Sequence, residues 1–153
     1  MNASAADSPA ARHRARRAAV QALYQWQMTG QDATEIETQF LGRRELARAD
    51  DAFFHSLLDA VAGTAAELDR RFAPLLDRPV EQLDPVERAI LRIGVFELSE
   101  RPDIPARVVI SEAVRLARIF GADQSYKYVN GVLDRFARDA RSAEFEPRPR
   151  AGA

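Results

Sequence analysis

The segment from residue 84 to residue 98 constrains the fold most, because it predicts a helix that is apolar on nearly every side. Asp84, Pro85 and Glu87 mark its start, with an N-cap aspartate, a proline at the first helical position and an acid in the first turn. The apolar side chains that follow are Ile90, Leu91, Ile93, Val95, Phe96 and Leu98. Such a helix has to be covered by other elements, so we expect it at the centre of a bundle.

The rest of the chain also has helical periodicity. No stretch alternates apolar and polar residues as a strand does, and no Asn-Gly or Asp-Gly turn joins two β-rich runs. The further predicted helices cover about 11–28 (ending at Gly30), 34–41 (with Thr34 as N-cap), 50–76 (with a possible bend at Gly63), 105–120 (ending at Gly121) and 124–140. The expected fold is an all-α bundle of six or seven helices, formed by one domain over residues 11–140. We expect the tails, 1–10 and 141–153, to be disordered.

Composition restricts the class of protein. With 153 residues, 46% hydrophobic and 29% charged, the chain is typical of one soluble globular domain. No apolar run approaches the roughly 18 residues that a membrane span needs, and the first residues do not resemble a secretory leader. We therefore expect no membrane association, and a cytoplasmic location. There is no cysteine, His13 and His55 are far apart, and no nucleotide-binding or hydrolase motif occurs, so neither a metal, a cofactor nor an enzyme is predicted.

The first unusual segment is basic. Four arginines and His13 fall between residues 12 and 17, and no acidic residue occurs between Asp7 and Asp32, although the net charge is only −1. On a helix, Arg14, Arg17 and Tyr24 point away from the alanine-rich face that should be buried. A charge run of this kind is often only a solvated helix end, and it is also what a nucleic-acid contact requires.

The second unusual segment covers residues 124–134. It contains Lys127, the only lysine in the chain, next to Tyr128. Gly131 is unfavourable in a helix interior by roughly 1 kcal/mol relative to alanine, which suggests close packing or access for a partner. From its position, Tyr128 is either a tyrosine at the edge of the core or a ring on which a base stacks, and the residues alone leave both interpretations open.

Several motifs, in order, resemble the NusB family of bacterial transcription antitermination factors. They are residues 16–27 (RRAAVQALYQWQ), residues 86–94 (VERAILRIG) with Glu97-Leu98, residues 120–122 (FGA) and residues 127–134 (KYVNGVLD). Their order and spacing fit from about Arg12 to Asp134. The resemblance therefore covers most of the chain.

The resemblance implies a NusB-like helical protein that binds RNA together with the ribosomal protein NusE. The pair would bind single-stranded boxA RNA of ribosomal RNA leaders and, within an antitermination complex, help RNA polymerase resist termination. Carried over by position, the residues implied to contact RNA are Arg12, Arg14, Arg16, Gln124, Lys127 and Tyr128. Those implied to contact the protein partner are Tyr24, Glu81 and Glu87. The family often has an acidic residue in place of Gln124 and phenylalanine in place of Tyr128.

Two other classes of function are compatible with the sequence. One is a helical adaptor that binds proteins and makes no direct RNA contact. The other is an RNA-modifying enzyme, because domains of this kind also occur fused to RNA methyltransferases. The chain has no cofactor motif that would supply such an activity. RNA titration with and without a protein partner separates the adaptor from the RNA-binding factor.

Overall fold

The structure is a computed structural model that describes residues 8–147. Its α-helices are α1 (Pro9–Thr29), α2 (Ala33–Phe40), α3 (Asp51–Phe72), α4 (Pro85–Glu100), α5 (Ala106–Phe120), α6 (Ser125–Ala140) and the short α7 (Ser142–Phe145). Three single turns of 3₁₀ helix, η2 (Arg44–Leu46), η3 (Ala73–Leu75) and η4 (Val80–Gln82), lie in the connections. No strand occurs in the described part of the chain, and the predicted all-α fold is confirmed.

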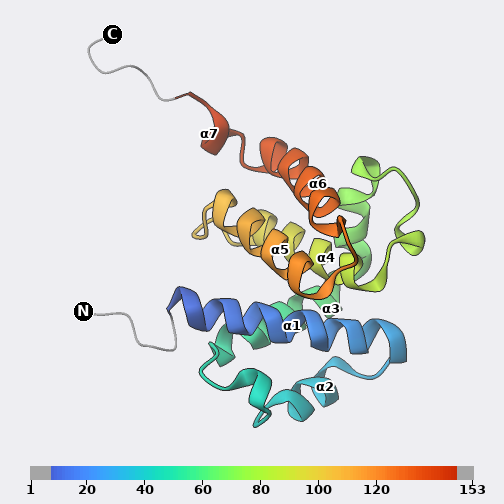
Figure 1. Cartoon of the computed structure of the whole chain (residues 1–153), viewed down its shortest axis with the longest axis vertical. Helices are drawn as coiled ribbons and strands as arrows, with labels where there is room; N and C mark the ends of the chain where they lie inside the picture. Colours follow the sequence, from blue (N-terminus) through green and yellow to red (C-terminus); the bar gives the residue numbers. More distant parts are fainter. Residues whose placement is uncertain (1–7, 148–153) are drawn as a thin grey trace.

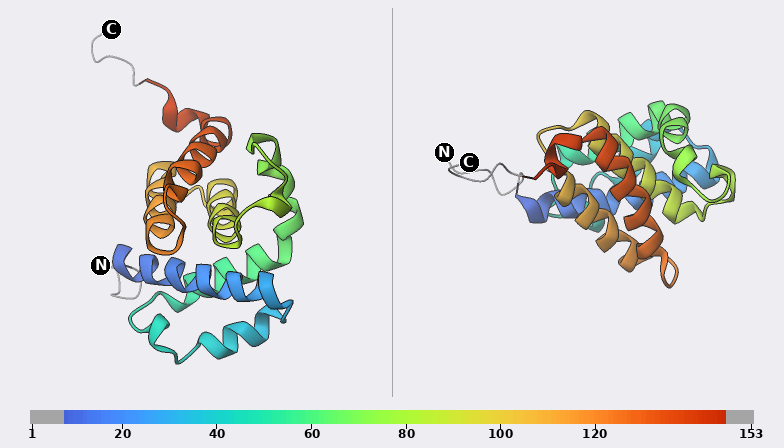
Figure 2. Two further views of the ribbon diagram at one scale, coloured as in Figure 1. Left: turned by 45° about the vertical axis from the view of Figure 1, so that its right-hand side comes forward. Right: turned by 90° about the horizontal axis from the view of Figure 1, so that it is seen from above.

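Helix α4 is the centre of the bundle, as its all-round apolar sequence predicts. It packs against α1, α3, α5 and α6, and every residue from 89 to 98 is buried. Helix α1 lies across one end of the α4, α5 and α6 group, with α2 and the loop after it on the other side of α1 (Figures 1 and 2). This layout exposes one side of α1 to solvent near the end of α5.

The helix starts follow capping chemistry, with one correction. Asp84 accepts a hydrogen bond from the amide of Val86 at 2.8 Å and begins α4, as predicted. Helix α2 begins after Asp32, whose carboxylate accepts from the amide of Thr34 at 2.8 Å. The prediction that Thr34 is the N-cap is therefore wrong, because the carboxylate two residues earlier already satisfies its amide. Helix α3 bends at Thr64, beside the predicted position Gly63.

Two glycines explain how closely the helices approach. A Cβ atom on Gly94 of α4 would lie 2.7 Å from the side chain of Leu133 on α6, so glycine permits this helix crossing. Gly131 has nothing within 4 Å of such an atom. Close packing is therefore not the reason for Gly131, and this part of α6 stays open.

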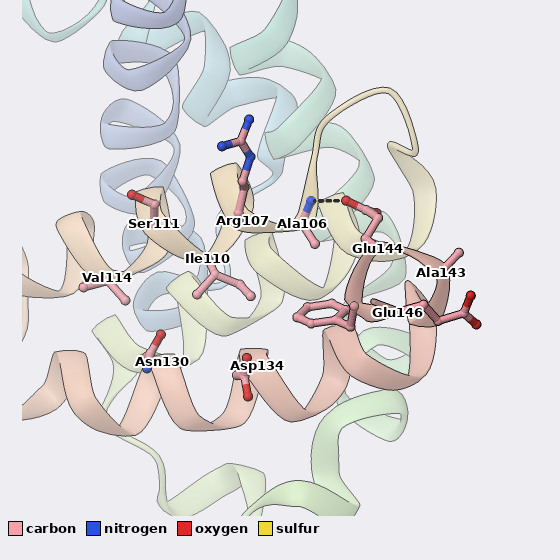
Figure 3. Close-up of a pocket in the computed structure, with 11 residues that line it drawn as sticks. Ala106, Arg107, Ile110, Ser111, Val114, Asn130, Asp134, Ala143, Glu144 and Glu146 are labelled. Atoms are coloured by element: carbon pink, nitrogen blue, oxygen red, sulfur yellow. Dashed lines mark hydrogen bonds between the residues drawn. The ribbon is translucent and has the colours of Figure 1, made fainter. Parts of the chain in front are cut away.

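The residues after α6 are ordered as far as the structure describes them, which corrects the prediction of a disordered tail for 141–147. Glu144 accepts a hydrogen bond at 2.9 Å from the amide of Ala106 and so satisfies the start of α5 (Figure 3). The Arg141 guanidinium donates to four backbone carbonyls at the end of α4 and in the loop that follows, those of Glu97, Leu98, Arg101 and Ile104. Residues 8–10, which also fall in a predicted disordered tail, form the N-cap and the first residues of α1. The other tail residues, 1–7 and 148–153, lie outside the described residues.

Candidate nucleic-acid interface

The basic segment at the start of α1 is divided between the core and the surface. Arg16 is buried, and its Nε and Nη2 donate to the two carboxylate oxygens of Glu97 at 2.9 and 2.7 Å. Arg14 and Arg17, on the other side of the helix, carry no such pair. The 100° step between helical residues separates neighbouring arginines into these two groups.

Arg16 is therefore a correction to the expected RNA-contacting set. Its guanidinium is 3% exposed and already makes a bidentate ion pair, so RNA cannot reach it without breaking the core. The sequence did contain a signal for this. Glu97 is an acid near the end of a helix that is apolar all round, and a buried carboxylate requires a cation opposite it.

Arg12 is neither fully buried, as Arg16 is, nor without a carboxylate nearby. Its side chain is 32% exposed, its Nε is 3.9 Å from a carboxylate oxygen of Asp50, and its guanidinium lies 5.2 Å from the ring centre of Phe53. Arg16 and Arg101 also approach the Phe53 ring, at 4.9 and 5.4 Å. Arg12 thus anchors α1 to the start of α3 while part of its side chain remains accessible.

The start of α6 presents the other predicted RNA-contacting residues together. Lys127 and Gln124 are both exposed, and no acidic residue lies in the first turn of the helix. Gln124 has a left-handed backbone, with φ 70°, which turns the chain sharply into α6. The ammonium group of Lys127 supplies a positive charge at this corner, next to the carboxylate of Asp123.

Tyr128 is half-buried, and its contacts hold it against the loop before α4. Its hydroxyl donates to Asp77 Oδ1 at 3.0 Å, and the Arg78 guanidinium lies 5.0 Å from the centre of its ring. Hydrogen bonds from Arg78 and then from Tyr128 lower the pKa of Asp77 to about 2. Burial and the bond to Asp77 raise the pKa of Tyr128. The ring therefore packs at the edge of the core and is also held in a fixed orientation next to a cation.

Of the three residues predicted to meet a protein partner, only Tyr24 lines an apolar groove. Tyr24 is 42% exposed and lines a groove of about 570 Å³. The other apolar residues of this groove are Val20, Met28, Phe40, Val86 and Phe120. Glu81 is exposed in η4, whereas Glu87 is half-buried and accepts a hydrogen bond at 2.7 Å from the hydroxyl of Ser125. Glu87 therefore joins the first turn of α4 to the first turn of α6.

A different groove, of about 750 Å³, lies between α5 and α6 and is closed at one end by α7. Figure 3 shows Ile110 and Val114 of α5 facing Asn130 and Asp134 of α6 across it. None of the predicted site residues lines this groove. Within residues 8–147, no group of three or more histidine, aspartate or glutamate side chains could hold a metal ion. No helix in that range is long and apolar enough to span a membrane.

The fold and these exposed surfaces are those of a small all-helical binding protein. The NusB family model matches residues 13–138, and the chain belongs to the NusB family of transcription antitermination proteins. This confirms the resemblance seen in the motifs. NusB proteins are not enzymes, so the prediction that the chain is not an enzyme is also confirmed.

Relatives and solved structures agree over nearly the whole chain. The transcription antitermination protein NusB of Alcanivorax borkumensis is 54% identical over 144 residues, which cover 94% of this chain and 96% of that protein. The NusB protein of Yersinia pestis is 53% identical over 133 residues, 87% of this chain and 96% of its own length.

Among solved structures, T. maritima NusB superimposes with a TM-score of 0.77 at 28% identity, covering 89% of this chain and 97% of that one. A second structure contains the antitermination factors NusB and NusE in complex with double-stranded RNA. It has a TM-score of 0.74 at 27% identity, over 86% of this chain and 99% of the other.

Proposed function

We propose that the chain pairs with the ribosomal protein NusE, binds single-stranded boxA RNA of ribosomal RNA leaders and helps RNA polymerase resist termination. The observation that carries the proposal is the similarity to a NusB chain solved with NusE and double-stranded RNA. The proposed RNA contacts are Arg12, Arg14, Gln124, Lys127 and Tyr128, without the buried Arg16. Since nascent bacterial RNA is cytoplasmic, the proposal also places the chain in the cytoplasm.

The chemistry of the RNA side supports this function. Single-stranded RNA is held by phosphate contacts from basic residues and by bases stacked on aromatic or guanidinium planes. The start of α6 offers the exposed ammonium group of Lys127 and the ring of Tyr128 at one corner. Tyr128 is fixed by Asp77 and Arg78, so little side-chain freedom would be lost when a base stacks on it.

The partner side is a surface of a different kind. Tyr24 and Met28 are 42% and 57% exposed and lie in one apolar groove, an arrangement typical of protein contacts. The exposed carboxylate of Glu81 adds negative charge that a basic ribosomal protein would complement. Phe120 lines this groove and also a neighbouring groove that contains Arg14, Arg17 and Arg44, so the two surfaces adjoin. RNA could therefore contact both proteins of the pair.

The test is a fluorescence anisotropy titration of a boxA-type RNA with the chain alone, with NusE alone and with both. We expect the pair to bind most tightly, and a scrambled RNA to bind more weakly to it. A duplex of the same sequence, included as a competitor, reports whether the single strand is preferred.

The adaptor alternative makes a different prediction in the same experiment. An adaptor would bind NusE but leave the RNA affinity of NusE unchanged, and substitutions at Lys127 and Tyr128 would have no effect on RNA binding. That result would contradict direct RNA contact and leave only the protein-binding role.

A further inference from the structure

A second basic surface lies on α1, away from the start of α6. Arg14, Arg17 and Gln21 follow one another at helical spacing on the solvent side of α1. Together with Arg44 of η2 and the ring of Phe120 at the end of α5, they line a groove of about 460 Å³. Two segments that are distant in sequence thus bring three guanidinium groups to one groove, and a third segment adds an aromatic ring.

Carboxylates do not neutralise these arginines, whereas they do pair with several other exposed arginines of the described chain. Neither Arg14 nor Arg44 has a carboxylate within 4.0 Å among the described residues, and Arg17 only approaches the Phe120 ring, at 5.8 Å. Elsewhere, Arg70 and Arg78 lie 2.7 Å from a carboxylate oxygen. Glu45 is the single acid that lines the groove, so its guanidinium groups outnumber its carboxylates three to one.

We propose that Arg17 and Arg44, together with Arg14, bind phosphates of the RNA strand and extend the RNA interface from α6 along α1 to η2. The inference rests on the proposed function and adds Arg17 and Arg44 to it. A guanidinium group presents a planar fork of donors that matches a phosphate, and it is always charged. An aromatic ring beside unpaired guanidinium groups is also the combination that single-strand-binding sites use.

The position of the groove favours an RNA strand over an acidic protein. Phe120 lies at the end of α5, and only the short turn of residues 121–124 separates it from the start of α6. A strand held by Lys127 and Tyr128 therefore has a short path to Arg17. The neighbouring groove around Tyr24 is the apolar, protein-type surface, whereas three arginines on two segments suit a charged backbone.

The experiment compares the Arg17→Gln/Arg44→Gln variant with the native chain in the presence of NusE. Association with boxA-type RNA is measured from about 50 to 300 mM salt. Each lost phosphate contact on a single strand reduces the slope of log K against log salt by about 0.7, so we expect the slope to become shallower by about 1.4. Arg17→Lys/Arg44→Lys keeps both charges and should retain most of the slope.

The matched control is Arg70→Gln/Arg107→Gln, which removes the same charge from exposed positions on α3 and α5. For this control, the slope of log K against log salt should equal that of the native chain. Thermal melts of all variants confirm that each is folded at the assay temperature.

The outcomes separate the two proposals. If the native chain with NusE binds no RNA, the proposed function fails. If the native chain binds but the groove variant keeps the slope and affinity of the control, the groove is not part of the RNA site. If the groove variant instead loses NusE while its RNA slope is unchanged, the groove binds protein and our inference is wrong.

Discussion

Arg16 and its neighbours Arg14 and Arg17 are the same residue type within one helical turn, yet they lie in different environments. Arg16 is 3% exposed and makes a bidentate ion pair with Glu97 of the central helix. Arg14 and Arg17 line a surface groove and have no carboxylate partner among the described residues. Position around the helix decides which guanidinium stabilises the fold and which remains available to a ligand. A run of basic residues is therefore not, by itself, a binding site.

The largest expected effect is on stability, from Arg16→Ala. Removing one partner of a buried ion pair leaves Glu97 uncompensated, and such changes lower the free energy of unfolding by about 3–5 kcal/mol. Urea denaturation measures the loss. Arg14→Ala, the surface control from the same turn, should change stability by less than about 0.5 kcal/mol.

The double variant Arg16→Met/Glu97→Leu sharpens the test. It removes both charges, so it should recover much of the stability that Arg16→Ala loses. If Arg16→Ala leaves stability intact and instead reduces RNA binding, then Arg16 belongs with the surface arginines. The separation of the α1 arginines into a buried and an exposed group would then be wrong.

The next effect concerns the start of α6. Tyr128→Ala removes a ring that can stack on a base, a contact of about 1–3 kcal/mol, so RNA affinity should fall roughly tenfold or more. Tyr128→Phe retains the ring and loses only the hydrogen bond to Asp77, and it should keep most of the affinity. Lys127→Ala should weaken binding by an amount that shrinks as salt rises.

Binding of NusE is the control for these variants and should not change. If Tyr128→Ala mainly destabilises the fold while its folded fraction binds RNA normally, the tyrosine packs at the edge of the core and does not contact RNA. Like Arg16, it would then stabilise the fold.

A smaller effect is expected on the apolar surface. Tyr24→Asp places a charge in the groove beside Met28 and should weaken NusE binding by on the order of 1 kcal/mol, with little change in melting temperature. Glu87→Arg should also weaken it by charge reversal, but with some loss of stability, because Glu87 accepts a hydrogen bond from Ser125. Calorimetric titration with NusE and a thermal melt measure the two effects separately.

The smallest effect comes from an exposed pair, the counterpart of the buried Arg16–Glu97 contact. His55 Nδ1 lies 2.7 Å from Glu37, and this hydrogen bond and charge raise the pKa of His55. Its contribution to stability is complete below the ordinary histidine pKa of about 6.5 and is lost as the pH rises through the raised value.

Native protein and His55→Gln should therefore differ in unfolding free energy by at most about 0.5 kcal/mol at pH 5.5, since solvent screens the pair, and should converge near pH 8.5. Denaturant titration at the two pH values checks this. A difference that grows with pH would contradict the assignment of the pair.

The sequence by itself determined the elements and the class of fold. Helical periodicity, the Asp84-Pro85 start and the all-round apolar helix after it required a helical bundle with α4 inside. Local signals such as Gly30 placed helix ends correctly. These features depend on backbone geometry and on the burial of apolar surface, both of which operate within one segment. The ordered motifs likewise identified the family.

Only the tertiary structure determined which charged side chains are buried and which groups they pair with. Whether Arg16 is buried depends on Glu97, which lies 81 residues away, and no local pattern joins the two. Tyr128 is held by the hydrogen bond that its hydroxyl donates to Asp77, and the groove on α1 needs Arg44 from η2. The order of residues 141–147 depends on carbonyls at the end of α4 that Arg141 satisfies. Each outcome depends on which group a folded neighbour presents, and a buried charge is stable only beside its complement.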